Sequence, residues 1–114
     1  MPTREWRLRI ADMLEYIERA QSYVAGMTFE QFVADRKTVD AVVLTLHVIG
    51  EAARNVPSDI QAKYPDIEWV DVISMRHKIA HGYFLVDFNI IWRVVGDPLS
   101  RLKVGLQRIP IDQS

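Results

Sequence analysis

Apolar residues recur every three or four positions along most of the chain, which is the period of an amphipathic α-helix. Over residues 4–24 one side of such a helix is apolar and carries Trp6, Ile10, Met13, Leu14, Ile17 and Val24. Gly26 is placed to end this helix, and Thr28 with Gln31 three residues later resembles a capping box that begins the next one. No stretch shows the sustained alternation of a strand. The pattern predicts an all-α protein.

The same rhythm continues over residues 29–56, with a bend expected near Asp35, before Pro57 ends that segment. Residues 60–64 have room only for a short turn of helix. A central helix is expected to begin at Pro65 and Asp66, with Asp66 as its N-cap, and to end at Gly82.

A last helix, capped by Asp87, keeps its apolar rhythm as far as Ile109. Pro98 should kink it, because proline has no N–H to donate to the carbonyl of Val94. We therefore expect an antiparallel bundle of four main helices plus a short helix, in a single domain that covers residues 1–114. The wide apolar stripe of this last helix also makes dimerisation plausible.

The composition is that of an ordinary globular domain, with 114 residues, 49% hydrophobic and 25% charged. The chain has no cysteine, which excludes a disulfide framework and thiolate chemistry and fits a cytoplasmic protein. No apolar run approaches the length that spans a membrane, and the N-terminus lacks a signal region. Because the formal net charge is only -1, any positive potential that attracts an anionic partner should be focused in one cleft.

Residues 74–83 are the expected location of that cleft, since no acidic residue lies between positions 71 and 87. The segment contains Arg76, His77, Lys78, His81 and Tyr83. An arginine provides a planar, permanently charged donor for phosphate, and a histidine can give and take a proton near neutral pH. The pairing of Arg76 with His81 suits phosphodiester cleavage.

Arg76, His81 and Tyr83 form the pattern Arg-x4-His-x-Tyr, which resembles the signature of the HEPN superfamily, in particular its HepT-like (DUF86) branch. The order and spacing of other segments are also similar to that branch: Ile49–Ala53, Pro65–Trp69, Met75–Arg76, Val86–Asp87 and Trp92. The chain departs from the pattern at His77, where relatives often have Asn, and at Leu44 and His47, where charged side chains are expected.

The resemblance implies a homodimeric, metal-independent endoribonuclease toxin from a prokaryotic toxin–antitoxin pair. Arg76 and His81 would be the catalytic residues, with His77 and Lys78 in support. A cognate nucleotidyltransferase antitoxin of the MNT type would transfer AMP to Tyr83 and silence the toxin. RNA is the implied substrate, with no cofactor, no DNA and no membrane among the partners.

The spacing of the motif raises a geometric question. Arg76 and His81 are five residues apart, so on a regular helix they lie about 140° apart around the axis. They could converge if the helix loosens near Gly82, or if Arg76 of one subunit meets His81 of the other. His77 and His81, four residues apart, share a face.

Each of these residues also has a plainer interpretation. Arg76 and His81 could hydrogen-bond helix ends and a neighbouring carboxylate, and Tyr83 could be a half-buried aromatic residue. His77 and His81 have the spacing of a zinc pair, but Lys78 would repel the metal and no third ligand is evident, so no metal is expected. His47 is expected in the core or at an interface, while the sequence leaves the roles of Glu51 and Arg54 open.

The alternative function is a non-catalytic helical module. It would bind RNA or a nucleotide through the same cationic cleft, or would only dock the nucleotidyltransferase. Such a module needs positive charge but no titratable group, so the presence of both Arg76 and His81 favours the enzyme.

Overall fold

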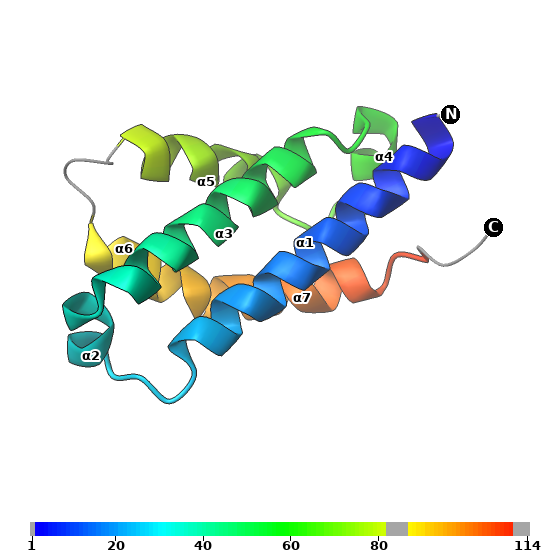
Figure 1. The fold of residues 1–114 in the computed structure, drawn as a ribbon. Helices are drawn as coiled ribbons and strands as arrows, with labels where there is room; N and C mark the ends of the chain where they lie inside the picture. The colour runs from blue at the N-terminus through cyan, green and yellow to red at the C-terminus, as the bar shows by residue number, and fades with distance from the viewer. Residues whose placement is uncertain (1, 82–86, 111–114) are drawn as a thin grey trace.

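The computed structural model describes the backbone of residues 2–81 and 87–110 and the side chains of residues 5–75 and 87–110. This part of the chain contains seven helices and no strand: α1 Pro2–Val24, α2 Phe29–Ala34, α3 Arg36–Arg54, α4 Ser58–Lys63, α5 Trp69–His81, α6 Phe88–Val95 and α7 Asp97–Gln107 (Figure 1). With α2 and α3 taken as one bent segment and α6 and α7 as one interrupted segment, these are four main segments and the short α4. The predicted all-α bundle is confirmed.

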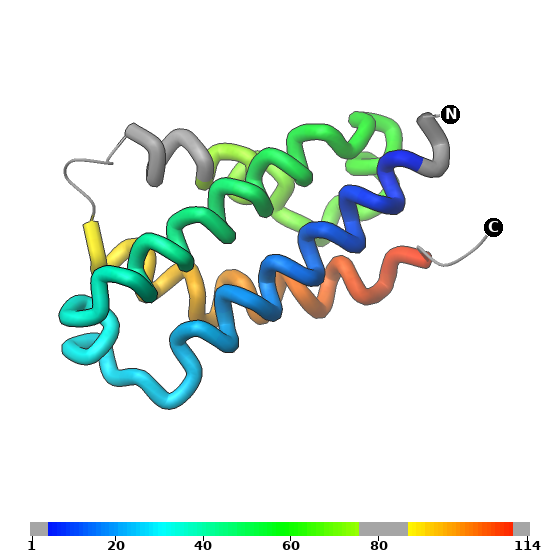
Figure 2. The backbone as a smooth tube through the Cα atoms, in the orientation of Figure 1, coloured from blue at the N-terminus to red at the C-terminus, as the bar shows by residue number. Residues whose placement is uncertain are grey.

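The long helices α1 and α3 lie side by side through the middle of the molecule (Figure 2). Helix α5 packs on α3, and α7 packs on α1, so the core lies between these four helices. Its largest fully buried side chains are Phe32, Ile10, Met13, Ile17, Leu46, Ile49, Leu99, Leu106, Val39 and Val42. Each large apolar side chain buried in this way contributes about 1.5–3 kcal/mol to the stability of the bundle.

Local sequence explains how the helices begin and end at the turns on either side of α2. Gly26 has φ 78°, a left-handed conformation that favours glycine after a helix. The Thr28 hydroxyl accepts from the Gln31 N–H at 3.1 Å and the Gln31 side chain accepts from the Thr28 N–H at 2.9 Å, so the predicted capping box is present. Asp35 makes the expected bend, because its carboxylate accepts the Thr38 N–H at 3.2 Å and caps α3.

The predicted beginning of the central helix is wrong. Helix α5 begins at Trp69 rather than at Asp66, because residues 65–67 form a turn in which the Ile67 N–H donates to the Tyr64 carbonyl at 3.1 Å. The first bond of α5 runs from the Val72 N–H to the Glu68 carbonyl at 3.0 Å, which makes Glu68 the residue before the helix.

The last segment is interrupted rather than kinked. Helix α6 ends at Val95, Gly96 separates the two helices, and α7 begins at Asp97. Pro98 therefore lies in the first turn of a new helix, where its missing N–H costs nothing. Asp87 caps α6 as expected, since its carboxylate accepts the Asn89 N–H at 3.0 Å.

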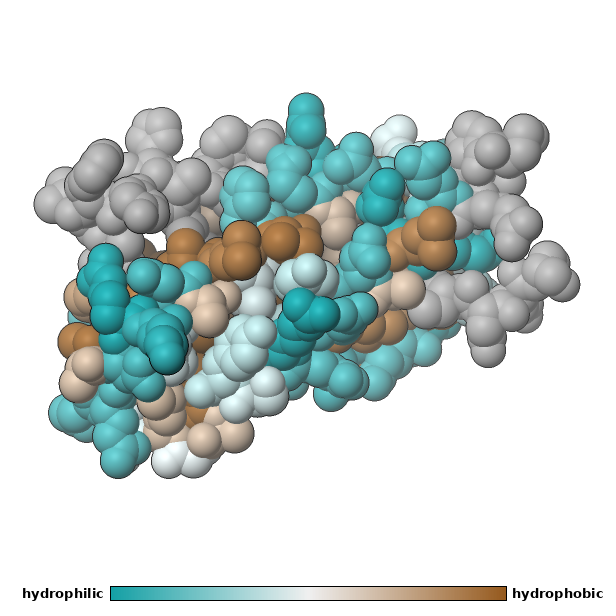
Figure 3. Space-filling view, viewed as in Figure 1, coloured by the Kyte–Doolittle hydropathy of each residue, from teal (hydrophilic) through white to brown (hydrophobic). Residues whose placement is uncertain are grey.

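Two surface features complete the fold. Within the described residues, none of the helices combines the length and the apolar character that a bilayer crossing requires. Hydrophobic residues gather over α3 in Figure 3, and the large apolar side chains exposed on α1 and α3 include Leu8 and Leu44.

Candidate active site

The predicted catalytic and supporting residues occupy the C-terminal half of α5, which carries Arg76, His77, Lys78 and His81. The side chains of these four residues lie outside the described part of the chain, and so does the whole of Tyr83. The backbone is helical through His81, so Arg76 and His81 belong to one continuous helix. At 3.6 residues per turn they occupy positions about 140° apart around its axis.

The other half of α5 is firmly anchored. Trp69, Val72 and Met75 are buried in the core, at one position per turn. The indole Nε1–H of Trp69 donates to the Tyr64 carbonyl at 3.0 Å, which fixes the start of the helix to the preceding turn. A buried indole N–H that has its acceptor avoids the cost of an unsatisfied donor. The backbone that carries Arg76 and His81 therefore extends from a rigid base.

Acidic and basic residues lie at opposite ends of the segment formed by α5 and the residue before it. Glu68 and Asp71 stand at its beginning, whereas the positions from Arg76 to His81 carry every basic residue of the helix. Carboxylates near the N-terminus and cations near the C-terminus both interact favourably with the helix dipole. An anionic substrate would be attracted to the C-terminal half and repelled from the other end.

Helix α3 packs along α5 and contributes polar residues whose role the sequence left open. His47 is exposed, so the expectation of a core histidine is wrong, while an interface role stays a prediction. Glu51 and Arg54 form an ion pair at 3.8 Å. The Glu51 carbonyl also accepts the Asn55 side-chain N–H at 2.8 Å, so a side chain satisfies this carbonyl at the C-terminal end of α3.

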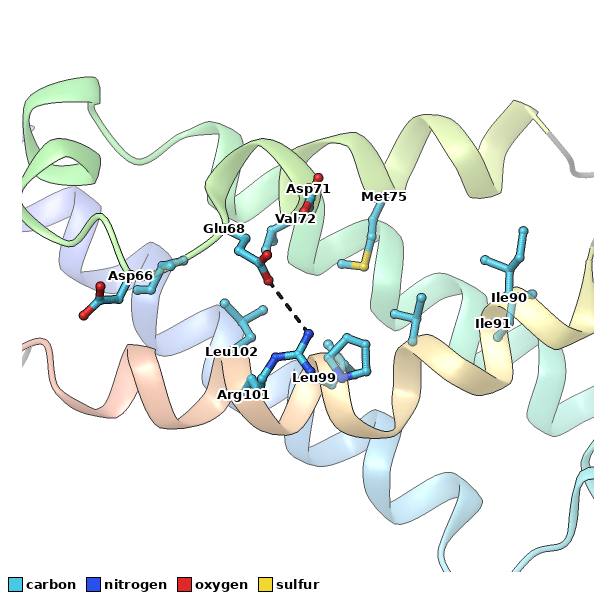
Figure 4. Close-up of a pocket in the computed structure, with 13 residues that line it drawn as sticks. Asp66, Glu68, Asp71, Val72, Met75, Ile90, Ile91, Leu99, Arg101 and Leu102 are labelled. Atoms are coloured by element: carbon cyan, nitrogen blue, oxygen red, sulfur yellow. Dashed lines mark ion pairs between the residues drawn. The ribbon is translucent and has the colours of Figure 1, made fainter.

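A groove of about 360 Å³ lies between α5 and the α6–α7 pair, and sequence reasoning did not find it (Figure 4). Its apolar lining includes Val72, Met75, Ile91, Leu99 and Leu102. The one feature of the sequence that pointed toward this groove was the wide apolar stripe of the last segment. It could not reveal a groove, because periodicity does not tell whether an apolar face meets another helix or leaves a space beside it.

No group of three or more His, Cys, Asp or Glu side chains is placed to hold a metal ion among the residues with described side chains. His77 and His81 lie outside that set, so the geometry of a zinc pair is not defined by this structure.

Comparisons with known proteins agree with the motif. Residues 13–109 match the family model described as "Ribonuclease HepT-like". A Thermococcus cleftensis protein named "Probable ribonuclease HepT" is 35% identical over 100 residues, which cover 88% of this chain and 91% of that protein. A Methanocaldococcus jannaschii protein named "Putative RNase MJ0127" is 39% identical over 95 residues, covering 83% of this chain and 78% of that protein. No solved structure matches the chain.

The family match extends over all the helices from the middle of α1 to the end of α7, and it includes the Arg-x4-His-x-Tyr segment. The family model and the relatives therefore lead to the same assignment. The chain belongs to the ribonuclease HepT-like family.

Proposed function

We propose that this protein is a metal-independent endoribonuclease that acts as the toxin of a prokaryotic toxin–antitoxin pair in the cytoplasm. The observation that carries the proposal is that Arg76 and His81 both lie on the C-terminal half of a helix whose N-terminal half is anchored in the core. The relatives named as ribonucleases support RNA as the substrate.

The active unit in this proposal is a homodimer. Arg76 and His81 lie about 140° apart on α5, so one chain does not present both at a single phosphate from the regular part of the helix. Two copies of α5 facing each other bring Arg76 of one subunit to His81 of the other. Each dimer then has two equivalent sites.

The chemistry follows from these two side chains. Neutral His81 withdraws the proton from a ribose 2′-hydroxyl, and the 2′-oxygen attacks the adjacent phosphorus. The bond between phosphorus and the 5′-oxygen breaks, and a protonated histidine of the dimer gives that leaving oxygen its proton. Arg76 stabilises the additional negative charge on the phosphorus oxygens in the transition state, while His77 and Lys78 hold the flanking phosphates. The products are a 2′,3′-cyclic phosphate and a 5′-hydroxyl.

Regulation acts on Tyr83, two residues beyond His81. A nucleotidyltransferase antitoxin transfers AMP from ATP to the phenolic oxygen and releases pyrophosphate. The attached phosphate is an anion beside Arg76, Lys78 and His81, so it occupies the cleft that attracts RNA. Tyr83→Phe removes the acceptor oxygen, and the variant should keep nuclease activity in the presence of transferase and ATP.

Cleavage of total cellular RNA in excess EDTA tests the proposal. Wild-type protein should cleave, whereas Arg76→Ala and His81→Ala should each lose at least a hundredfold in rate, the usual range for a general base or a charge-stabilising donor. Arg101→Ala removes an exposed arginine of α7 and should cleave like wild type.

The same experiment separates the enzyme from a binding module. If wild type and all variants leave the RNA intact but bind it with equal affinity, the chain is a non-catalytic RNA-binding domain. If RNA is neither cut nor bound, while the transferase still forms a complex with the chain, the domain serves only as a docking partner.

A further inference from the structure

The groove between α5 and the α6–α7 pair is apolar along its floor and open to solvent at its edge. The floor includes the buried side chains Val72, Met75, Leu99 and Leu102 (Figure 4). The α6 wall includes Ile90, which is 43% exposed although it is a large aliphatic residue. An exposed apolar side chain beside an apolar floor is typical of a surface that receives a partner.

The rim of this groove is acidic. Among the residues with described side chains, Asp66, Glu68 and Asp71 line it with a single basic residue, Arg101. Arg101 and Glu68 approach to 3.9 Å across the groove, and both side chains are about two-thirds exposed. Because an exposed ion pair is weak, it opens readily for an incoming cation. Asp66 and Asp71 give the described part of the rim a net negative charge.

We propose that this groove binds the apolar face of a basic amphipathic helix from a second protein. Two or three apolar side chains at helical spacing would fill the floor, and flanking lysines or arginines would pair with Asp66, Glu68 and Asp71. The inference is independent of RNA cleavage, since it concerns the opposite half of α5 from Arg76 and His81.

Other occupants fit less well. RNA is anionic and would be repelled by the three carboxylates. A groove that lay on the axis of a twofold dimer would face its own copy, and two concave surfaces with the same net charge do not fill each other.

The test uses the full-length protein and a fluorescent synthetic peptide of about 15 residues, with Leu at positions i, i+3, i+4 and i+7 and Lys on both sides of that stripe. One control peptide has Glu in place of each Lys, and another has the same composition in scrambled order. Binding is followed by fluorescence anisotropy, the mass of the protein by light scattering, and the fold of each variant by circular dichroism.

Two pairs of variants separate the groove from the general surface. Ile90→Arg introduces a cation into the groove wall, and Val104→Arg makes the same change at a 50% exposed position of α7 that does not line the groove. Glu68→Gln with Asp71→Asn removes two rim charges, and Glu30→Gln with Asp59→Asn removes two exposed charges elsewhere.

The proposal expects saturable binding of one basic peptide per chain, with affinity at least tenfold lower in Ile90→Arg and in the rim pair and unchanged in the two control variants. The Glu and scrambled peptides should not bind saturably. The proposal would be overturned if the basic peptide did not bind, or if Val104→Arg lowered its affinity as much as Ile90→Arg does. Conversion of a dimer to a monomer by Ile90→Arg would assign the groove to a second copy, and loss of RNA binding in the same variant would assign it to RNA. Either result would also contradict the proposal.

Discussion

The indole of Trp69 and the backbone carbonyl of Tyr64 are joined by a hydrogen bond of 3.0 Å across the turn that precedes α5. Trp69 is 6% exposed, so this donor is satisfied inside the core rather than by solvent. The bond connects the short helix α4 and its following turn to the helix that carries the candidate catalytic residues. Disturbing it should affect the base of that helix before anything else.

Trp69→Phe tests this relationship. It removes the side-chain donor to the Tyr64 carbonyl, which keeps only the Ile67 N–H, and it removes part of a buried ring, so the free energy of unfolding should fall by about 1–3 kcal/mol. Urea denaturation measures the change. Tyr64→Phe keeps the carbonyl and should have a much smaller effect, and equal stability of Trp69→Phe and wild type would mean that the bond does not fix the turn.

Phe32 should be the most sensitive aromatic residue of the contact between α2 and α6. Its ring centroid lies 5.2 Å from that of Trp92, and its side chain is fully buried. Phe32→Ala should lower the free energy of unfolding by about 3–5 kcal/mol, as expected for a buried phenylalanine. Phe29 is half-buried and 6.1 Å from Trp92, so Phe29→Ala should cost clearly less in the same urea titration. A reversed order would place the packing contact at Phe29.

Acid should weaken the bend between α2 and α3. The backbone N–H of Thr38 donates to the Asp35 carboxylate and lowers the pKa of that group below its ordinary 3.8. A lowered folded pKa adds stability that is complete above the unfolded pKa and is lost as the pH falls through the folded pKa.

The stability difference between wild type and Asp35→Asn should therefore be constant at neutral pH and shrink as the pH drops below about 3.8. Urea midpoints measured across that range give the difference. Asp59→Asn, an exposed residue of α4, is the control for general charge effects. A difference that does not change with pH would show that the carboxylate charge adds nothing to the cap.

Mixing two inactive variants should restore cleavage if the site spans two subunits. Arg76→Ala and His81→Ala should each be inactive alone. After denaturation and refolding together, half of the dimers are mixed and each has one intact site, so about a quarter of wild-type activity should return. The RNA cleavage rate of the mixture measures this. If the mixture stays inactive while exchange of labelled subunits is complete, both residues act from one chain.

Much of the fold could be predicted because helix-forming rules are local. The apolar rhythm of residues 4–24 and the Thr28–Gln31 capping box correspond to α1 and to the beginning of α2. Asp66 misled the prediction of α5, because an aspartate suits an N-cap and a turn equally well. Asp66 lies instead in the turn that the hydrogen bond between the Ile67 N–H and the Tyr64 carbonyl closes.

Features set by a single residue or by packing were harder to predict. The apolar positions from Phe88 to Ile109 keep their spacing across Gly96, so periodicity could not reveal that two helices meet there. His47 lies between the buried Leu46 and Ile49 but on the exposed side of α3, which apolar neighbours in sequence do not show. The positions of Arg76 and His81 on one helix were predictable, whereas the way their side chains meet depends on the proposed dimer, which a single sequence does not define.

The chemical form of the RNA ends is the most direct measurement of the central claim, that His81 activates a ribose hydroxyl and Arg76 stabilises the transition state without a metal. Fragments produced by wild-type protein in excess EDTA should carry 2′,3′-cyclic phosphates and 5′-hydroxyls, and His81→Ala should produce neither. Fragments with 3′-hydroxyl and 5′-phosphate ends, or cleavage that disappears in EDTA, would contradict the account.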